Sequence, residues 1–451
     1  MENSFLITKC MLRPNEGSSL KEDYDIVAGN PIIDYYESIE SPSISMTITF
    51  IDIDQVIGRK GITGGEYIDL IVKTDDEDAD DFKITAEKQK LMLNSVRNMV
   101  TESNKQVATL EFVSVETIIN ETARVNKKYT GNISDTVMQL LIGDKKGIGT
   151  SKKLFGPVDE KLGETDVEKD RATNSYSFVG NLKRPFDTIQ WLCPKAQSAT
   201  DDFGFLFYET LDGYHFRSIK SLLEQDAITY QQTDAQGISN KILQNNLNQS
   251  NDIGMNLRMG MYANRTIYVD IENQKTKTVD FKASDLKLNK PATLLTGIED
   301  YPTRLMVRVS DLGVAQKGSK KEDEQPESEL AVYQNKSYIR NNLLFSQSLS
   351  ISIPLNTTLR AGFALDIRLP LKQENGDAAV DSYGNEKSND PSGRYLIGEL
   401  RHLIGGGQSE TQLKLIRDVF TVDKTGITDT GELIRADNRQ YGNTWPAFRS
   451  K

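Results

Sequence analysis

Apolar and polar residues alternate along the first 120 residues in the way that half-buried strands require. In the segment 43–54 the apolar residues share one face: Ile44, Met46, Ile48 and Phe50. A second alternating segment at 64–74 opens with a Gly64–Gly65 turn, and a third lies at 107–119. The pattern predicts that residues 1–120 form a small β-barrel or sandwich with a helix at its exit.

The middle of the chain, residues 121–234, shows helical spacing instead. One helix is predicted to begin at Ser134, a capping residue, and to stop at Gly143. A second helix is predicted between Pro185, which suits a first turn, and Pro194, which ends or kinks it. These two helices indicate a region of mixed α and β structure.

An aromatic hairpin and a polar loop complete the prediction for the middle region. The segment 203–219 places Asp212–Gly213 between two aromatic-rich runs, and an Asp-Gly pair favours a hairpin because the turn needs positive φ. The segment 144–175 is polar and rich in Gly, Lys and Asp, which predicts a long surface loop.

Strand patterns return in residues 235–420 and predict a second β-barrel. We interpret 255–271 as two strands broken at Ala263–Asn264, and four more alternating runs lie between 345 and 420. The remaining residues, 421–451, form a weakly patterned C-terminal tail.

Two peripheral inserts, at about 276–344 and 373–393, are predicted to interrupt the second barrel. The first insert contains the segment 318–329, which has almost no apolar residue. Such a segment cannot bury enough apolar surface to offset the entropy lost on ordering, so we expect it to be exposed and mobile.

Composition narrows the possible functions. The chain has 451 residues and a net charge of −11, which disfavours a surface that binds nucleic-acid phosphates. No apolar run approaches the roughly 18–20 residues of a membrane span, and the N-terminus lacks the features of a signal peptide. We therefore expect neither stable membrane insertion nor specific nucleic-acid binding.

Cysteine and histidine are scarce, which bears on metal and redox chemistry. Cys10 and Cys193 are the two cysteines, and we expect each to be a small buried apolar side chain rather than part of a disulfide. His215 and His402 are the two histidines, too few for a His-rich site, and no CxxC pair accompanies them. The sequence predicts no metal, no cofactor and no catalytic residue.

Acidic residues are the first candidates for catalytic groups. Asp201–Asp202 and Glu209 border the aromatic hairpin, as a carboxylate pair does in a glycosidase. With 65 Asp and Glu in the chain, such pairs arise by chance. We favour a solvated hairpin rim for these residues.

A cation and a phosphate are the next ligands considered. The acidic run 75–81 lacks the spacing and the glycine of a calcium loop. The glycine-rich segments 61–66 and 405–410 lack the GK[ST] of a P-loop, so both are predicted to be turns.

Rings near the hairpin leave a binding role open. An aromatic ladder at the hairpin could stack on bases or sugars, but the apolar face of a sheet is the favoured interpretation; its members are Phe203, Phe205, Phe207, Tyr214 and Phe216. His402 is expected on the polar face of a strand, and no serine or cysteine elbow accompanies His215.

Five segments in order resemble one family, the central baseplate hub proteins of T-even-like and cyanophage-type myoviruses, which are related in fold to the spike-hub proteins of type VI secretion. These segments are YYESIESPSISMTITFID, SYSFVGNLKRPFDTIQWL, FGFLFYETLDGYHFRSI, MGMYANRTIYVDI and SGRYLIGELRHLIGGGQSETQLKLIRDVF. The resemblance covers nearly the whole chain to about residue 420. It is weakest in the loops at 144–175, 318–340 and 373–393.

The resemblance implies two similar β-barrel tube domains in each chain, which are therefore expected to share a strand order. Three chains would form a pseudo-hexameric ring, which joins the six-fold tail tube to the three-fold spike and leaves a bore for DNA. The implied partners are two further copies of the chain, the spike trimer, the tail tube protein or a tube initiator, and other baseplate proteins. The implied location is the virion tail baseplate, assembled in the host cytoplasm.

Two alternatives from other classes remain open at this point. One is a tail-associated peptidoglycan hydrolase, and the other is a carbohydrate-binding receptor module that would use Phe207 and Tyr214. In the C-terminal tail, Tyr441, Trp445 and Phe448 lie within eight residues, and clustered aromatics of this kind are typical of interface centres. Either the tail folds back on its own barrel or these three residues bind the spike.

Overall fold

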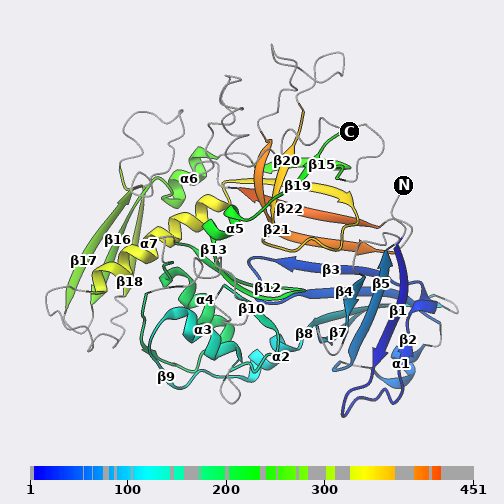
Figure 1. Ribbon diagram of the computed structural model, residues 1–451. Coiled ribbons are helices and arrows are strands. Elements are labelled where there is room, and N and C mark those ends of the chain that lie inside the picture. The colour runs from blue at the N-terminus through cyan, green and yellow to red at the C-terminus, as the bar shows by residue number, and fades with distance from the viewer. Residues whose placement is uncertain are drawn as a thin grey trace.

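A computed structural model describes most of the chain (Figure 1). The described residues are 5–53, 55–62, 64–74, 81–85, 89–102, 105–142, 147–156, 172, 174–198, 203–233, 240–249, 252–270, 274–282, 301–309, 326–370, 391–405 and 409–417. The fold is mainly β, as the alternating pattern predicts, and its largest part is one sheet of 14 strands.

The N-terminal part of the large sheet comes from the first 114 residues. Its strands are β1 (Phe5–Arg13), β2 (Tyr24–Asp25), β3 (Ile32–Ser38), β4 (Ser45–Asp52), β5 (Tyr67–Thr74), β6 (Phe82–Ile84), β7 (Leu91–Glu102) and β8 (Lys105–Ser114). The alternation in 43–54 works as predicted, because Met46, Ile48 and Phe50 of β4 all point into the core. Between β4 and β5 lies the short helix α1 (Val56–Lys60).

The C-terminal part of the sheet comes from residues after 227. Its strands are β14 (Ile228–Gln231), β15 (Gln244–Gln249), β19 (Gln347–Pro354), β20 (Ala364–Arg368), β21 (Gly393–Ile404) and β22 (Glu410–Arg417). The two parts join where β21 pairs antiparallel with β3, from Glu399 opposite Ser38 to Ile404 opposite Ile33.

The two parts of the sheet follow the same strand order. In the N-terminal part the order is β3-β4-β8-β7-β5-β1, and in the C-terminal part it is β15-β19-β22-β21-β20-β14. If the short strands β2 and β6, which pair with β1 and β5, are left aside and the six remaining strands of each part are numbered along the chain, both orders are 2-3-6-5-4-1. The pairs differ in direction only at the end, where β1 and β5 are antiparallel and β14 and β20 are parallel. The expected common strand order is confirmed.

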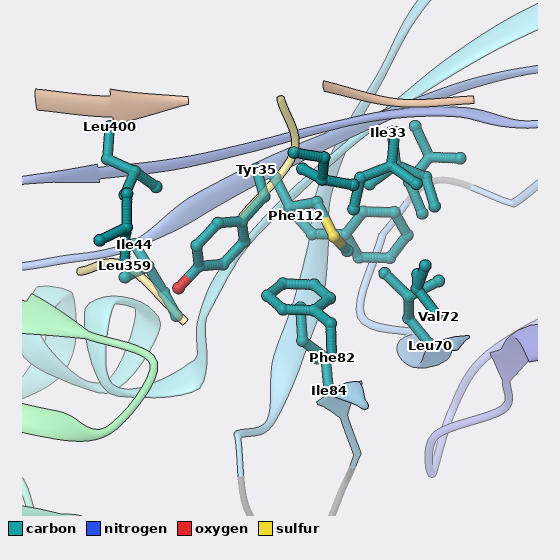
Figure 2. Close-up of a cluster of buried hydrophobic side chains, with 14 of the residues drawn as sticks. Ile33, Tyr35, Ile44, Leu70, Val72, Phe82, Ile84, Phe112, Leu359 and Leu400 are labelled. Atoms are coloured by element: carbon teal, nitrogen blue, oxygen red, sulfur yellow. The ribbon is translucent and has the colours of Figure 1, made fainter. Parts of the chain in front are cut away.

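The pairing of these strands does not close into a barrel among the described residues. The sheet instead runs from β15 at one end to β1 and β2 at the other, and both parts pack onto one apolar core. Figure 2 shows this shared core, in which Leu400 of the C-terminal part lies near Ile44 of the N-terminal part.

The middle region has its own small core below the sheet. Its helices are α2 (Val115–Thr122), α3 (Ile133–Ile142), α4 (Pro185–Leu192) and α5 (Ile219–Glu224). Its strands are β9 (Lys128–Tyr129), β10 (Lys153–Phe155), β11 (Phe178–Val179), β12 (Phe205–Thr210) and β13 (Gly213–Ser218). The helix at Pro185, the helix near Ser134 and the Asp-Gly hairpin are present as predicted. The predicted cap is wrong, because the helix begins at Ile133 and the hydroxyl of Ser134 accepts from the backbone N–H of Ala172.

The predicted surface loop 144–175 is wrong in part. Within it, β10 pairs in parallel with β13, so that Lys153 lies opposite Gly213. A side chain on Gly213, at φ +146°, would collide with the carbonyl oxygen of Lys153. The glycine therefore permits the close approach of β10 as well as the turn.

A third unit projects from the sheet and contains an element that the pattern misassigned. A three-stranded sheet, ordered β17 (Lys275–Lys282), β16 (Ala263–Asp270) and β18 (Arg304–Val309), packs on the long helix α7 (Pro326–Leu344), as Figure 1 shows. The segment interpreted as the first strand of 255–271 is instead the helix α6 (Ile253–Met259). The side chain of Asp252 caps that helix by accepting from the Met255 N–H, and Gly260 ends it in the left-handed conformation.

The inserts are described only partly. The start of α7 covers Pro326 onward, so the last part of 318–329 is helical, while 318–325 lies outside the described residues. Of the second insert, residues 373–390 also lie outside them. The strands β16 to β18 form a sheet separate from the large one, although the pattern had grouped 263–271 with the second barrel.

Candidate functional site

Lys152 forms a buried ion network with two glutamates from distant parts of the chain. Its Nζ lies 2.7 Å from Glu116 Oε2 and 2.5 Å from Glu209 Oε1, and its side chain is 5% exposed. The second oxygen of Glu209 accepts from the hydroxyl of Ser114 at 2.6 Å and from the backbone N–H of Ile44 at 3.1 Å. The network therefore connects β8, the start of α2, the segment before β10, and β12.

Burial and charge act in opposite directions on the groups of this network. Burial raises the pKa of Glu209, and the ammonium of Lys152 opposes that rise. Burial also lowers the pKa of Lys152, but the two carboxylates outweigh it and hold that pKa above its usual value. Each charge is matched by an opposite charge or by hydrogen-bond donors, as a buried ion pair requires.

The network corrects the expectation that Glu209 lies on a solvated hairpin rim. Glu209 is fully buried, and donors occupy both of its carboxylate oxygens. Such a carboxylate has no access to a glycosidic bond, so Glu209 holds the hairpin to the large sheet. Asp201 and Asp202, the other residues considered for a glycosidase carboxylate pair, lie outside the described residues.

Glu37 forms a second buried junction that the sequence analysis missed. Its Oε1 accepts from the hydroxyl of Tyr35 at 2.7 Å and from the N–H of Leu211 at 2.8 Å, and its Oε2 accepts from the N–H of Ala361 at 2.8 Å. Burial raises the pKa of Glu37, whereas Arg360 lowers it. An acid in register with Ile33 and Tyr35 on an apolar strand face was the signal that could have revealed it.

Both histidines are buried and structural. The ring of His215 stacks between Phe155 and Tyr208, each with a centroid 4.7 Å away, and its Nε2 lies 2.9 Å from Thr210 Oγ1. His402 stacks on Tyr35, and its Nδ1 lies 2.9 Å from the hydroxyl of Thr411. The expectation that His402 lies on a polar strand face is wrong, because this part of β21 turns its even-numbered residues into the core.

The aromatic ladder of the hairpin is the apolar face that the pattern favoured. Phe207 and Tyr214 stack on one another with centroids 5.7 Å apart, and both are buried. These two rings therefore offer no surface to a base or a sugar. The carbohydrate-binding alternative loses the residues on which it depended.

The remaining candidate ligands find little support in the described part of the chain. No group of three His, Cys, Asp or Glu that could hold a metal occurs among the described residues. Of the acidic run 75–81, residue Asp81 is described, and it pairs with Lys83 at 3.0 Å. No helix among the described residues is long and apolar enough to cross a bilayer.

The cysteines are buried as predicted, whereas the predicted turns 61–66 and 405–410 are described only in part, since residues 63 and 406–408 lie outside the described residues. Gly61, Gly65 and Gly405 all have positive φ, as glycines in turns do. Cys10 and Cys193 are free and buried, and burial raises the pKa of each thiol to about 12. Neither thiol is poised for nucleophilic chemistry.

One end of the large sheet is open and is the strongest candidate for an assembly surface. Strand β15, with the sequence QNNLNQ, pairs on one side with β19 and has no strand on its other side among the described residues. Its side chains from Gln244 to Asn248 are exposed on both faces, and Leu247 is 40% exposed. The strand carries no charge and no proline, the features that commonly prevent an edge strand from pairing.

Strand β7 at the other part of the sheet has a free stretch of edge. It pairs with β8 along most of its length but meets β5 in a single residue pair, Tyr67 with Met92. The backbone edge of β7 from Arg97 to Glu102 therefore has no strand beside it among the described residues. The tail residues Tyr441, Trp445 and Phe448 lie outside the described residues.

Comparison with known proteins places this fold. No family model and no curated protein sequence matches the chain. The tail protein from Neisseria meningitidis MC58 matches in structure with a TM-score of 0.50 and 11% identity, covering 93% of this chain and 99% of that one. The 43 kDa tail protein of prophage MuSo2 from Shewanella oneidensis gives a TM-score of 0.49 and 10% identity, covering 92% and 100%.

A component of the type VI secretion system of E. coli matches with a TM-score of 0.40 and 9% identity, over 92% of this chain and 76% of that one. That protein is itself structurally similar to the bacteriophage T4 tail proteins gp27 and gp5. The match to the Neisseria protein shows that this chain has a phage-tail-protein fold over nearly its full length.

Proposed function

We propose that the chain is the structural hub of a contractile-tail baseplate, a homotrimeric ring without an active site. The observation that carries the proposal is the repeat of one strand order, 2-3-6-5-4-1, within a fold shared with a phage tail protein. Three chains with two equivalent units each supply six similar units, which match a six-fold tail tube on one side and a three-fold spike on the other.

In this proposal the two units are the tube domains, 1–120 and the C-terminal part of the sheet, which begins at β14 and therefore starts a few residues before the predicted boundary at 235, and the rest of the middle region lies outside the ring. The net charge of −11 suits a bore through which DNA passes without sticking. The ring sits in the virion baseplate after assembly in the host cytoplasm, in contact with the tail tube protein or a tube initiator and with other baseplate proteins. The tail 421–451 meets the spike.

The non-enzymatic part of the proposal rests on how the candidate groups are used. Glu209 and Glu116 are both paired with the buried ammonium of Lys152, and the two histidines are buried against aromatic rings. A peptidoglycan hydrolase is the alternative from another class. Zymography of the purified chain on peptidoglycan tests it: we expect no clearing, and reproducible clearing would contradict the proposal.

A further inference from the structure

The internal repeat of the sheet identifies where two copies of the chain meet. Within one chain, the second strand of the N-terminal unit, β3, pairs with the fifth strand of the C-terminal unit, β21. The reverse combination joins the second strand of the C-terminal unit, β15, to the fifth strand of the N-terminal unit, β7. These two strands, both among the described residues, do not pair with each other within one chain. We propose that the free edge of β15 in one copy pairs antiparallel with the second half of β7 in a second copy. This inference rests on the proposed trimer and names its contact.

The edges have the dimensions that this equivalence requires. Strands β21 and β7 are both 12 residues long. In β21 the first residues pair with β20 and the last six, Glu399–Ile404, pair with β3. In β7 the pairing with β5 is likewise near the start, at Met92, and the last six residues, Arg97–Glu102, are the free edge. Strand β15 has six residues to place there.

The equivalence also gives an expected register. Strands β4 and β19, the neighbours of β3 and β15, are both eight residues long, and aligning their starts makes Ile32 equivalent to Asn245. Leu403 lies opposite Asp34 in the contact within the chain. By the same equivalence Asp34 corresponds to Leu247, and aligning the starts of β21 and β7 makes Leu403 correspond to Thr101. The contact between copies therefore places Thr101 of one copy opposite Leu247 of the next.

The chemistry of β15 fits backbone pairing with a second copy. A strand of Asn and Gln gains little from apolar burial, so its association depends on satisfying its main-chain N–H and C=O groups. The contact joins unlike edges, β15 to β7, and is therefore heterologous. Such a contact either closes into a ring or grows into a filament. The contact between β3 and β21 repeats the same step inside each chain, so each copy advances the ring by two equal steps.

Disulfide cross-linking tests the contact directly. The full-length variant Leu247→Cys with Thr101→Cys should give, after mild oxidation, cross-linked species of two and three chains and none larger. Each single variant should give none, which shows that the buried native cysteines do not react. A matched control joins Thr101→Cys with Leu182→Cys, because Leu182 is 64% exposed but lies in the middle region. Three further double variants combine Leu247→Cys with a cysteine at Met99, Val100 or Glu102, so that a shift in register is also detected.

The result separates this inference from the proposed function. If the sample has the mass of a trimer but no β7 position cross-links to Leu247, the strand contact is wrong and the trimer stands. If the unmodified chain is a monomer, the proposed function itself fails. Hydrogen exchange provides a second measurement without substitutions: amides of 244–249 and 97–102 should be protected at least tenfold more in the trimer than after dilution to monomer. Equal exchange in both states would overturn the contact.

Discussion

The ammonium of Lys152 lies 2.5 Å from the carboxylate of Glu209, although 57 residues separate the two in sequence. Lys152 precedes β10, and Glu209 belongs to β12, whose hairpin packs beneath the large sheet. Both residues belong to the middle region, and Glu209 also accepts hydrogen bonds from the hydroxyl of Ser114 and the N–H of Ile44, so its carboxylate connects the middle region to the large sheet.

Removing the cation from this network should be costly. In Lys152→Met two buried carboxylates lose their counter-charge, and breaking a buried pair in this way costs about 3–5 kcal/mol. Chemical denaturation of the variant measures the loss. The control Lys128→Met removes an exposed lysine from β9 and should change the free energy of unfolding by less than about 0.5 kcal/mol. Equal losses in the two variants would show that the network does not hold the regions together.

Buried histidines should make the protein less stable in acid. Burial lowers the pKa of His402 from 6.5 to about 3, and that of His215 likewise. Between these values the unfolded chain binds more protons than the folded one, so stability rises with pH and is lost as pH falls from 6.5 towards 3. The slope of the unfolding free energy against pH gives the number of protons that the chain takes up on unfolding. At pH 5 this number should be lower by about one in His402→Phe than in the unmodified protein. An unchanged slope would mean that His402 titrates normally in the folded state.

The glycine of the hairpin should tolerate no side chain. Gly213→Ala should lower the free energy of unfolding by about 1–3 kcal/mol more than Gly131→Ala. Both glycines have positive φ, but the added methyl meets the carbonyl of Lys153 in the first case and open space in the second. Thermal melting of both variants compares them. Similar losses would show that backbone conformation alone decides the cost.

Local signals in the sequence predicted many elements and failed where a contact was distant. The strand at 43–54, the helix at Pro185 and the Asp-Gly hairpin each follow from neighbouring residues, and the structure has all three. The helix α6 was missed although Asp252 and Gly260 bracket it, because its apolar residues also fit a strand pattern. Strand β10 was missed because its parallel partner β13 lies 58 or more residues away.

The candidate site was predictable only in part for the same reason. Burial of the aromatic hairpin follows from its aromatic-rich runs, whereas the partners of Glu209 are Ile44, Ser114 and Lys152, which no spacing rule connects. The repeat of strand order could not be read from the residues either, because equivalent strands such as β3 and β15 have different side chains. Topology, rather than side-chain identity, carries that relationship.

The aromatic residues of the C-terminal tail should act in binding rather than in folding. Trp445→Ala combined with Phe448→Ala should weaken capture of the spike trimer of the same tail by about 2–4 kcal/mol, as buried aromatic anchors do. The melting temperature and the oligomeric mass should not change. Tyr301→Ala is the matched control, since Tyr301 is 72% exposed and lies outside the tail. A variant that melts early yet still captures the spike would place the tail in the core of the hub.

The mass of the full-length protein in solution tests the central claim most directly. Sedimentation equilibrium across micromolar concentrations should give three times the 50.6 kDa of the chain, with no growth to larger species because the ring closes at three copies. A stable monomer throughout that range, or a mass that keeps rising with concentration, would contradict the trimeric hub.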